Sequence, residues 1–151
     1  MKLAGRLLAI DLGAKRVGVA VCDELRITVK PLPAIERRSW KDLLRRIAAL
    51  IELYEVHGLV VGLPLRLDGG EGSAASDARS VANKFERSLD IPVYLQDERL
   101  TTFAAASDLR SAARTEDEIE REIDSEAAAL ILRDFIVTGR NDNVNSPEAT
   151  T

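Results

Sequence analysis

The chain has 151 residues, of which 46% are hydrophobic and 30% are charged, a composition typical of one globular domain with its own core. Only 4% are aromatic, so aliphatic side chains must fill that core. No apolar run approaches the ~18 residues of a membrane span, and we expect no membrane association and no secretory signal. Cys22 is the only cysteine, so no internal disulfide can form, and we expect a cytoplasmic protein.

The net charge of −4 does not by itself favour nucleic-acid binding, but the charge is unevenly distributed. Residues 1–111 carry 17 Lys and Arg against 15 Asp and Glu, whereas residues 112–151 carry 4 against 10. The body of the chain is therefore mildly basic, and the acidic side chains are concentrated late in the sequence. A bound divalent cation would change the local balance at a cluster of carboxylates.

The first predicted element is a buried strand over residues 7–13, an apolar run that contains one carboxylate, Asp11. A charged carboxylate in an apolar interior needs a partner or a metal ion. Gly13 indicates that the strand ends there, which places Asp11 near the C-terminal end of the strand. Asp is also a favoured turn residue, so an ordinary turn remains an alternative.

Residues 16–22 predict a second strand that forms a hairpin with the first, and residues 27–30 begin a third extended segment. Pro31 and Pro33 should interrupt this segment, which marks a sheet edge or an exit toward Ala34 and Ile35. Ser39 is a good helix N-cap, and apolar residues then recur at helical spacing to about Glu55. A short buried strand over 59–62 completes a parallel strand–helix–strand unit.

The second half of the chain begins with a glycine-rich loop over residues 62–72. A helix over 73–89 and a strand over 91–96 follow, and Asp97 and Glu98 end that strand. We expect a short helix over 101–109, a mobile acidic loop over 111–123 and a last helix that begins at Asp124 and ends at Gly139. Residues 1–139 would form a single domain, and residues 140–151 would form a disordered tail.

These elements predict an α/β fold in which three antiparallel strands are followed by parallel strands, with helices between and after them. If the last helix packs beside the first strand, Asp11, Asp97, Glu98 and Asp124 converge at one mouth of the sheet. Carboxylates without a basic partner repel one another, and a divalent cation removes the repulsion. Oxygen ligands favour Mg²⁺ or Mn²⁺, a combination suited to phosphodiester hydrolysis. The single histidine, His57, does not indicate a zinc site.

Four segments in this order resemble the motifs of the YqgF/RuvX family and together extend from about residue 7 to residue 139. They are Ala9 to Val21, Val60 to Leu65 with Asp68-Gly69, Asp97 to Thr102, and Asp124 to Leu132. The resemblance implies a ribonuclease-H-like fold with a mixed five-stranded sheet and helices on both faces. It also implies a nuclease that processes the 5′ end of precursor 16S ribosomal RNA, or a Holliday-junction-resolvase-like endonuclease.

The resemblance further implies that Asp11, Glu98 and Asp124 form a catalytic, metal-binding triad for Mg²⁺ or Mn²⁺. Asp97 is a second candidate ligand, or else an acceptor for Arg99. Helix geometry turns Glu126 about 200° away from Asp124, so we assign Glu126 to the surface. A helix N-terminus would also favour a carboxylate at Asp124 without any catalytic role.

Four basic residues are candidates for nucleic-acid contacts: Lys15, Arg16, Arg66 and Arg99. The first two lie in the hairpin beside Asp11, and Arg66 lies in the glycine-rich loop, where a nucleic-acid backbone could approach closely. The acidic segment before Asp124 departs from the family, which usually has basic residues there. This departure argues against a substrate clamp and favours a segment that gates the site or repels unsuitable partners.

Two other functional classes remain open. The Asp-Leu-Gly motif at residues 11–13 also resembles the phosphate loop of actin-like and Hsp70-like ATPases, but those enclose ATP between two such domains. A non-catalytic RNA-binding assembly factor is the second alternative, and it predicts missing metal ligands. Precursor rRNA is the preferred substrate over branched DNA. The protein could be a monomer or a homodimer, and symmetric junction resolution would require the dimer.

Overall fold

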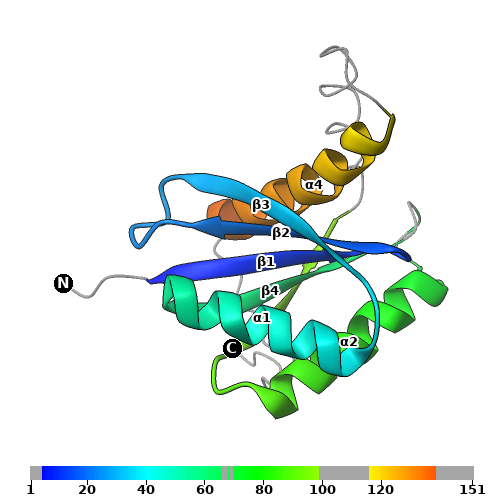
Figure 1. The fold of residues 1–151 in the computed structure, drawn as a ribbon, viewed down its shortest axis with the longest axis horizontal. Coiled ribbons are helices and arrows are strands. Elements are labelled where there is room, and N and C mark those ends of the chain that lie inside the picture. The colour runs from blue at the N-terminus through cyan, green and yellow to red at the C-terminus, as the bar shows by residue number, and fades with distance from the viewer. Residues whose placement is uncertain (1–4, 66–67, 69, 99–115, 139–151) are drawn as a thin grey trace.

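One mixed five-stranded sheet organises the structure, a computed structural model that describes residues 5–65, 68, 70–98 and 116–138 (Figure 1). Within residues 116–124 it describes the course of the helix but not the side chains. The strands are β1 (Arg6–Leu12), β2 (Arg16–Cys22), β3 (Val29–Glu36), β4 (Val56–Leu63) and β5 (Val93–Asp97). The helices are α1 (Trp40–Tyr54), α2 (Ser73–Ser88) and α4 (Glu116–Thr138).

The strand order is β3-β2-β1-β4-β5. β1 pairs antiparallel with β2, and β2 pairs antiparallel with β3, whereas β4 runs parallel to both β1 and β5. The predicted arrangement of three antiparallel strands followed by parallel strands is therefore confirmed. Because β1, β4 and β5 run parallel, the C-terminal ends of β1 and β5 lie at the same end of the sheet, on either side of β4.

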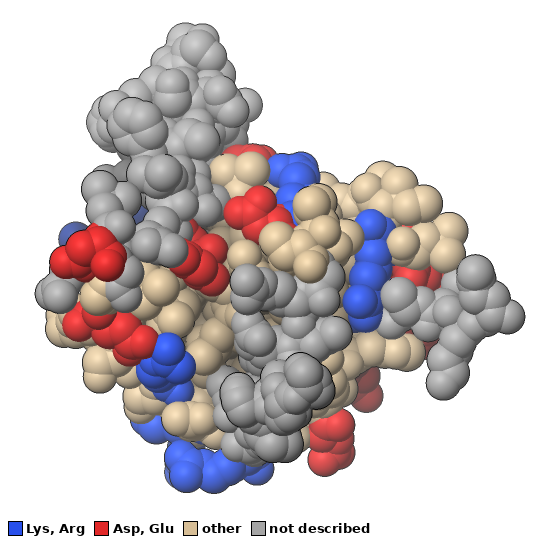
Figure 2. All heavy atoms as spheres, turned by 180° about the vertical axis from the view of Figure 1, so that it is seen from behind, with Lys and Arg blue, Asp and Glu red and all other residues tan. Residues whose placement is uncertain are grey.

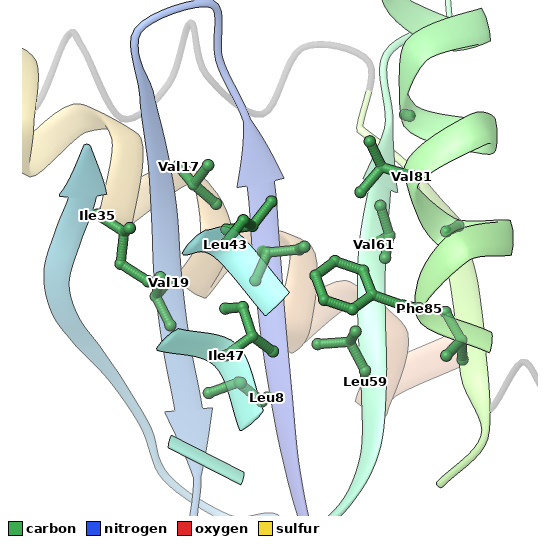
Figure 3. Close-up of a cluster of buried hydrophobic side chains, with 14 of the residues drawn as sticks. Leu8, Val17, Val19, Ile35, Leu43, Ile47, Leu59, Val61, Val81 and Phe85 are labelled. Carbon is green, nitrogen blue, oxygen red and sulfur yellow. The ribbon is translucent and has the colours of Figure 1, made fainter. Parts of the chain in front are cut away.

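The two faces of the sheet are covered by different helices. Side chains that alternate along each strand give two separate cores, as expected for strands that are buried on both faces. On one face α1 and α2 cover Leu8, Ile10, Val19 and Leu59, with Phe85 of α2 among them (Figure 3). On the other face α4 covers a smaller cluster: Leu7, Ala9, Ala20, Cys22, Val60, Ala128, Ala129, Ile131, Leu132 and Phe135.

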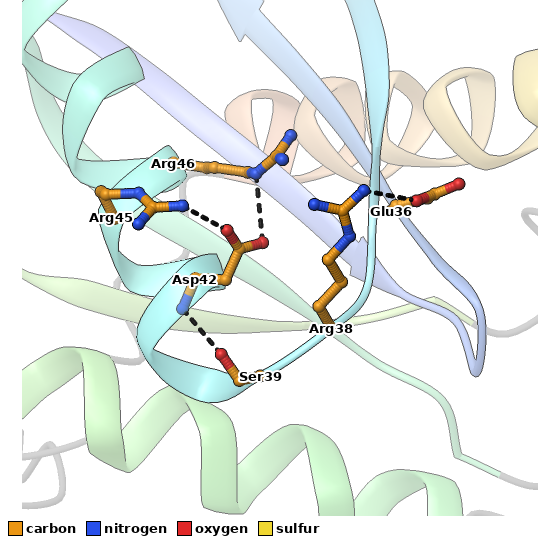
Figure 4. Close-up of polar contacts among 6 residues, drawn as sticks. All are labelled: Glu36, Arg38, Ser39, Asp42, Arg45 and Arg46. Atoms are coloured by element: carbon orange, nitrogen blue, oxygen red, sulfur yellow. Dashed lines mark hydrogen bonds and ion pairs between the residues drawn. The ribbon is translucent and has the colours of Figure 1, made fainter.

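The predicted start of α1 is confirmed. The Ser39 hydroxyl accepts a hydrogen bond from the Asp42 backbone N–H at 3.1 Å, which satisfies one of the free donors in the first turn (Figure 4). The Asp42 carboxylate in turn forms ion pairs with Arg45 and Arg46, at 2.5 and 3.1 Å. The helix ends at Glu55, whose left-handed backbone (φ 54°) closes the last turn.

Two predicted boundaries are wrong. The predicted position of β3 at the sheet edge is confirmed, but Pro31 and Pro33 do not interrupt the strand. It runs through both prolines because an edge strand can leave the proline side of its ladder unpaired. The last helix begins by Glu116 rather than at Asp124, so most of the predicted acidic loop is helical. Its glutamates are good helix formers, and extending a helix that is already packed adds little cost per residue.

Three predictions fall on parts of the chain that the structure does not describe: the helix over 101–109, the loop before residue 116 and the tail over 140–151. In the described part of the chain, none of the helices has the length and apolar character needed to cross a membrane.

Candidate active site

Asp11 lies on the face of the sheet that α4 covers. Leu7 and Ala9, four and two residues earlier in β1, pack against α4, and strand alternation continues this face to Asp11. Gly18 of β2 is the register partner of Asp11, and Gly62 of β4 follows Val61, the partner of Ile10. Residues without side chains therefore flank Asp11 on both neighbouring strands, which leaves room for other groups beside its carboxyl.

Glu98 fills part of this room. It follows β5 directly, and its backbone N–H donates to the Leu63 carbonyl at 3.2 Å. Its side chain crosses over Gly62, since a Cβ built on that glycine would lie 3.0 Å from Glu98 Oε2 and 2.6 Å from Ile131 Cδ1. The Glu98 carboxyl reaches Asp11 and forms a hydrogen bond with it. Two acids from non-adjacent strands thus meet above the strand between them.

The electrostatics of this pair are those of two acids that cannot both be charged. Burial, the largest cause, acts together with the neighbouring Asp11 carboxyl and the Asp97 charge to raise the pKa of Glu98 to about 9. Burial also raises the pKa of Asp11, while its hydrogen bond with Glu98 opposes that rise. A proton retained on one of the two carboxyls would relieve the repulsion. The turn interpretation of Asp11 is not supported, because its side chain is engaged with Glu98.

The donor set fits a hard divalent cation. Two neighbouring carboxyl groups whose pKa values are both raised are a pair that a divalent cation could bind in place of a proton. Among the side chains that the structure describes, no three ligating groups come together, so Asp11 and Glu98 form a pair there. A bound Mg²⁺ or Mn²⁺ would supply positive charge at a scissile phosphate and a more acidic water.

Asp124 belongs to the body of α4 and not to its first turn, since the helix is already formed at Glu116. The alternative in which a helix N-terminus alone favours this carboxylate is therefore wrong. The next residue, Ser125, is buried and forms hydrogen bonds with β2 and β3. Ile131, which lies close to Gly62, is seven residues after Asp124, a spacing of nearly two helical turns. The backbone of α4 at residue 124 is thus on the side of the sheet that carries Asp11.

Asp97 lies on the other face of the sheet from this pair. Along β5, Tyr94 packs with the α4 cluster and Leu95 with the α1 and α2 cluster, so alternation places Asp97 with Leu95. Its charge nevertheless contributes to the raised pKa of Glu98.

The structure describes two of the four basic residues proposed to contact nucleic acid. Lys15 is exposed in the turn between β1 and β2, and Arg16 is the half-buried first residue of β2, opposite Glu36 in the register. Arg66 and Arg99 lie outside the described residues. The face seen in Figure 2 carries acidic and basic side chains interspersed, without a surface of one sign among the residues coloured there.

One residue that sequence reasoning missed is Arg37, just after β3. Its guanidinium donates two hydrogen bonds to Asp77 of α2, at 2.8 and 2.9 Å, and one to the Gly13 carbonyl at 3.0 Å. Its backbone N–H donates to the Lys15 carbonyl at 2.8 Å. Arg37 therefore ties the turn after Asp11 to α2. Nothing in the sequence distinguishes it from the neighbouring surface arginine Arg38.

Comparisons with known proteins identify the family of the chain. Residues 5–138 match the RuvX family, described as Holliday junction resolvase. A protein of Anaeromyxobacter sp. (strain Fw109-5) named "Putative pre-16S rRNA nuclease" is 42% identical over 131 residues, which are 87% of this chain and 96% of that protein. A protein of the same name from Lactobacillus johnsonii is 39% identical over 142 residues, 91% of this chain and 99% of its own.

Solved structures show the same fold at low sequence identity. Thermus thermophilus RuvC in complex with a Holliday junction substrate superposes with a TM-score of 0.58 at 14% identity, covering 92% of this chain and 99% of that one. The fowlpox virus resolvase with Holliday junction DNA superposes with a TM-score of 0.52 at 12% identity, covering 90% and 99%. The fold is thus ribonuclease-H-like, and the matched family model and relatives establish that the chain belongs to the RuvX family.

Proposed function

We propose that this protein is a cytoplasmic nuclease that hydrolyses phosphodiester bonds with Mg²⁺ or Mn²⁺ and processes the 5′ end of pre-16S rRNA. The observation that carries the proposal is the buried contact between Asp11 and Glu98 over Gly62. Two carboxyls at the mouth of a sheet have no evident stabilising role, because burying them together is costly. Metal-assisted phosphodiester hydrolysis gives the arrangement a purpose.

The residues have separate roles in this proposal. Asp11 and Glu98, together with Asp124 from α4, would hold the metal. Asp97 would act through its charge, since it lies on the other face of β5. Lys15 and Arg16 follow Asp11 in the hairpin and would bind backbone phosphates, with Arg66 and Arg99 as further candidates.

The RNA substrate is preferred because the relatives that match this chain nearly end to end are named for pre-16S rRNA. Holliday junction DNA is the second candidate, favoured by the description of the family and by the folds of two resolvases solved with junction DNA. Symmetric junction cleavage would need two active sites and hence a dimer.

The test is a panel of three substrates: a pre-16S rRNA leader, unstructured RNA and a four-way DNA junction, each with Mg²⁺, Mn²⁺ or EDTA. Wild type should cleave the leader with metal only, and Asp11→Asn and Glu98→Gln should each lose at least about a hundredfold in rate. Asp134→Asn is the matched control, because this acid lies on an exposed part of α4. Cleavage of the junction alone would reverse the substrate order. No cleavage by wild type, or equal cleavage by Asp11→Asn, would overturn the nuclease function.

A further inference from the structure

Ser125 occupies an unusual position at the sheet. Its hydroxyl donates to the Leu32 carbonyl of β3 at 2.5 Å and accepts from the Val19 backbone N–H of β2 at 3.5 Å. Val19 and Leu32 are register partners in the β2–β3 ladder. A side-chain hydroxyl from α4 is therefore inserted between two strands and joins a donor of one to an acceptor of the other. The side chain is only 4% exposed.

A β-bulge explains why the ladder accepts this insertion. The register runs from Val17 opposite Ile35 to Val19 opposite Leu32, so Pro33 and Ala34 of β3 together face Gly18 of β2. An extra residue on one strand disrupts the local pairing, and Pro33 has no N–H to contribute. The bulge opens the ladder at the residue pair that Ser125 bridges.

The bulge is also beside the acid pair. Gly18, the residue that faces the two bulged positions, is the register partner of Asp11. Ser125 adjoins Asp124 in sequence, and its partner Val19 adjoins Gly18, which is opposite Asp11. The hydrogen bonds of Ser125 therefore fix α4 to β2 next to both acids.

We propose that Ser125 is a positioning residue, whose hydroxyl fixes α4 at the β2–β3 bulge so that Asp124 is held at the Asp11–Glu98 pair. A helix that only packs through Ala128, Leu132 and similar side chains can slide or rotate slightly at little cost. A hydroxyl bonded at once to a donor and an acceptor of the sheet cannot shift along it without losing both bonds. The inference rests on the proposed function, which gives Asp124 its role as a metal ligand.

The test compares Ser125→Ala with Ser125→Thr, which retains the hydroxyl, and with Phe135→Leu. Phe135 is buried on the same helix and stacks on Tyr94, and it lies ten residues, about 15 Å, from Ser125. Mn²⁺ binding is measured from the free-ion electron paramagnetic resonance signal, thermal unfolding is followed separately, and cleavage of the rRNA leader is measured against Mn²⁺ concentration.

Ser125→Ala should weaken Mn²⁺ binding about tenfold and raise the Mn²⁺ concentration for half-maximal cleavage equally, as for other residues that orient metal ligands. Ser125→Thr should recover most of the affinity. Phe135→Leu should lower the unfolding temperature and leave the affinity unchanged. Equal Mn²⁺ affinity of Ser125→Ala and wild type, or the same loss in Phe135→Leu, would overturn the inference. If wild type binds Mn²⁺ through Asp11 but cleaves nothing, the nuclease function is overturned. The Mn²⁺ affinity of Ser125→Ala would then still decide whether Ser125 is a positioning residue. Wild type that binds no Mn²⁺ would overturn both.

Discussion

The carboxyl groups of Asp11 and Glu98 hydrogen bond to each other although their strands, β1 and β5, are separated by β4. The contact is possible because Gly62, at the crossing point, has no side chain. A cation that binds these acids would compete with the protonation that their raised pKa values favour. Metal binding, protonation and the stability of this edge of the sheet are therefore linked.

The first prediction concerns the pH dependence of stability without metal. The folded-state pKa of Glu98 is raised to about 9 from 4.5, so between these values the folded protein keeps a proton that the unfolded chain has lost. The free energy of unfolding should therefore fall as pH rises through this window, by at most about 1.4 kcal/mol per pH unit. The raised pKa of Asp11 acts with the same sign. Urea unfolding in EDTA at pH 5 to 9 measures the slope.

Glu98→Gln should flatten this dependence, because the amide keeps a donor and has no proton to lose. Glu71→Gln is the control, since Glu71 is exposed and its pKa is lowered by Arg79. Parallel pH profiles for wild type and Glu98→Gln would contradict the prediction.

The second prediction concerns the space above Gly62. Gly62→Ala would place a methyl group 2.6 Å from Ile131 Cδ1 and 3.0 Å from Glu98 Oε2, so both side chains must move. We expect a loss of about 1–3 kcal/mol in stability from overpacking, and weaker Mn²⁺ binding because Glu98 is displaced. Chemical unfolding and Mn²⁺ titration measure the two effects.

Gly72→Ala is the matched control, because a Cβ at Gly72 meets nothing within 4 Å. It should change stability by less than about 1 kcal/mol, as expected at a helix N-cap, and leave metal binding intact. If the two alanine variants bind Mn²⁺ equally well, Gly62 does not keep the site open.

The third prediction concerns the bidentate pair of Arg37 and Asp77. Their side chains are 23% and 42% exposed, so a double-mutant cycle with Arg37→Ala and Asp77→Ala should give a coupling free energy of only about 1 kcal/mol. Arg37→Ala also removes the donor to the Gly13 carbonyl beside Asp11. It should therefore reduce cleavage more than Asp77→Ala does. Equal rates for the two variants would show that the tether to the turn has no effect on the site.

Much of the fold could be predicted because the apolar patterns are strong. The inner face of α2, with Ala75, Ala78 and Phe85, is buried as its helical spacing indicates, and the β2 limits agree at both ends. The start of α4 could not be predicted, because residues 116–123 are mostly charged and Ile119 and Ile123 are their only apolar residues. Helix propensity and propagation decide such a segment, because two apolar residues give only a weak periodic signal.

The candidate site divides in the same way. Asp11 is conspicuous because a carboxylate interrupts an apolar strand, and Glu98 because acids follow the end of another. Their contact, however, depends on the strand order and on Gly62, which a linear pattern does not encode. Arg37 and Ser125 act through hydrogen bonds to backbone atoms far away in sequence, so only the tertiary structure identifies them.

The fourth prediction concerns the electrostatic part of substrate binding. Lys15 is exposed in the turn two residues after Gly13, so it is placed to meet a phosphate near Asp11. Lys15→Ala should weaken binding of the rRNA leader severalfold in low salt. It should also reduce the slope of log affinity against log salt by about 0.7–0.9, the value for one lost phosphate contact. Fluorescence anisotropy in EDTA, which prevents cleavage, measures both quantities.

Lys30→Ala is the control for this change, because Lys30 is also exposed but lies in β3, opposite Val21 of β2 and far along the strands from the β1–β2 turn. It removes the same charge from the protein and should leave the slope within error of wild type. A loss that is equal in the two variants would mean that net charge alone governs binding. A loss confined to Lys15→Ala would place the nucleic-acid backbone over the β1–β2 turn, within reach of the Asp11 carboxyl.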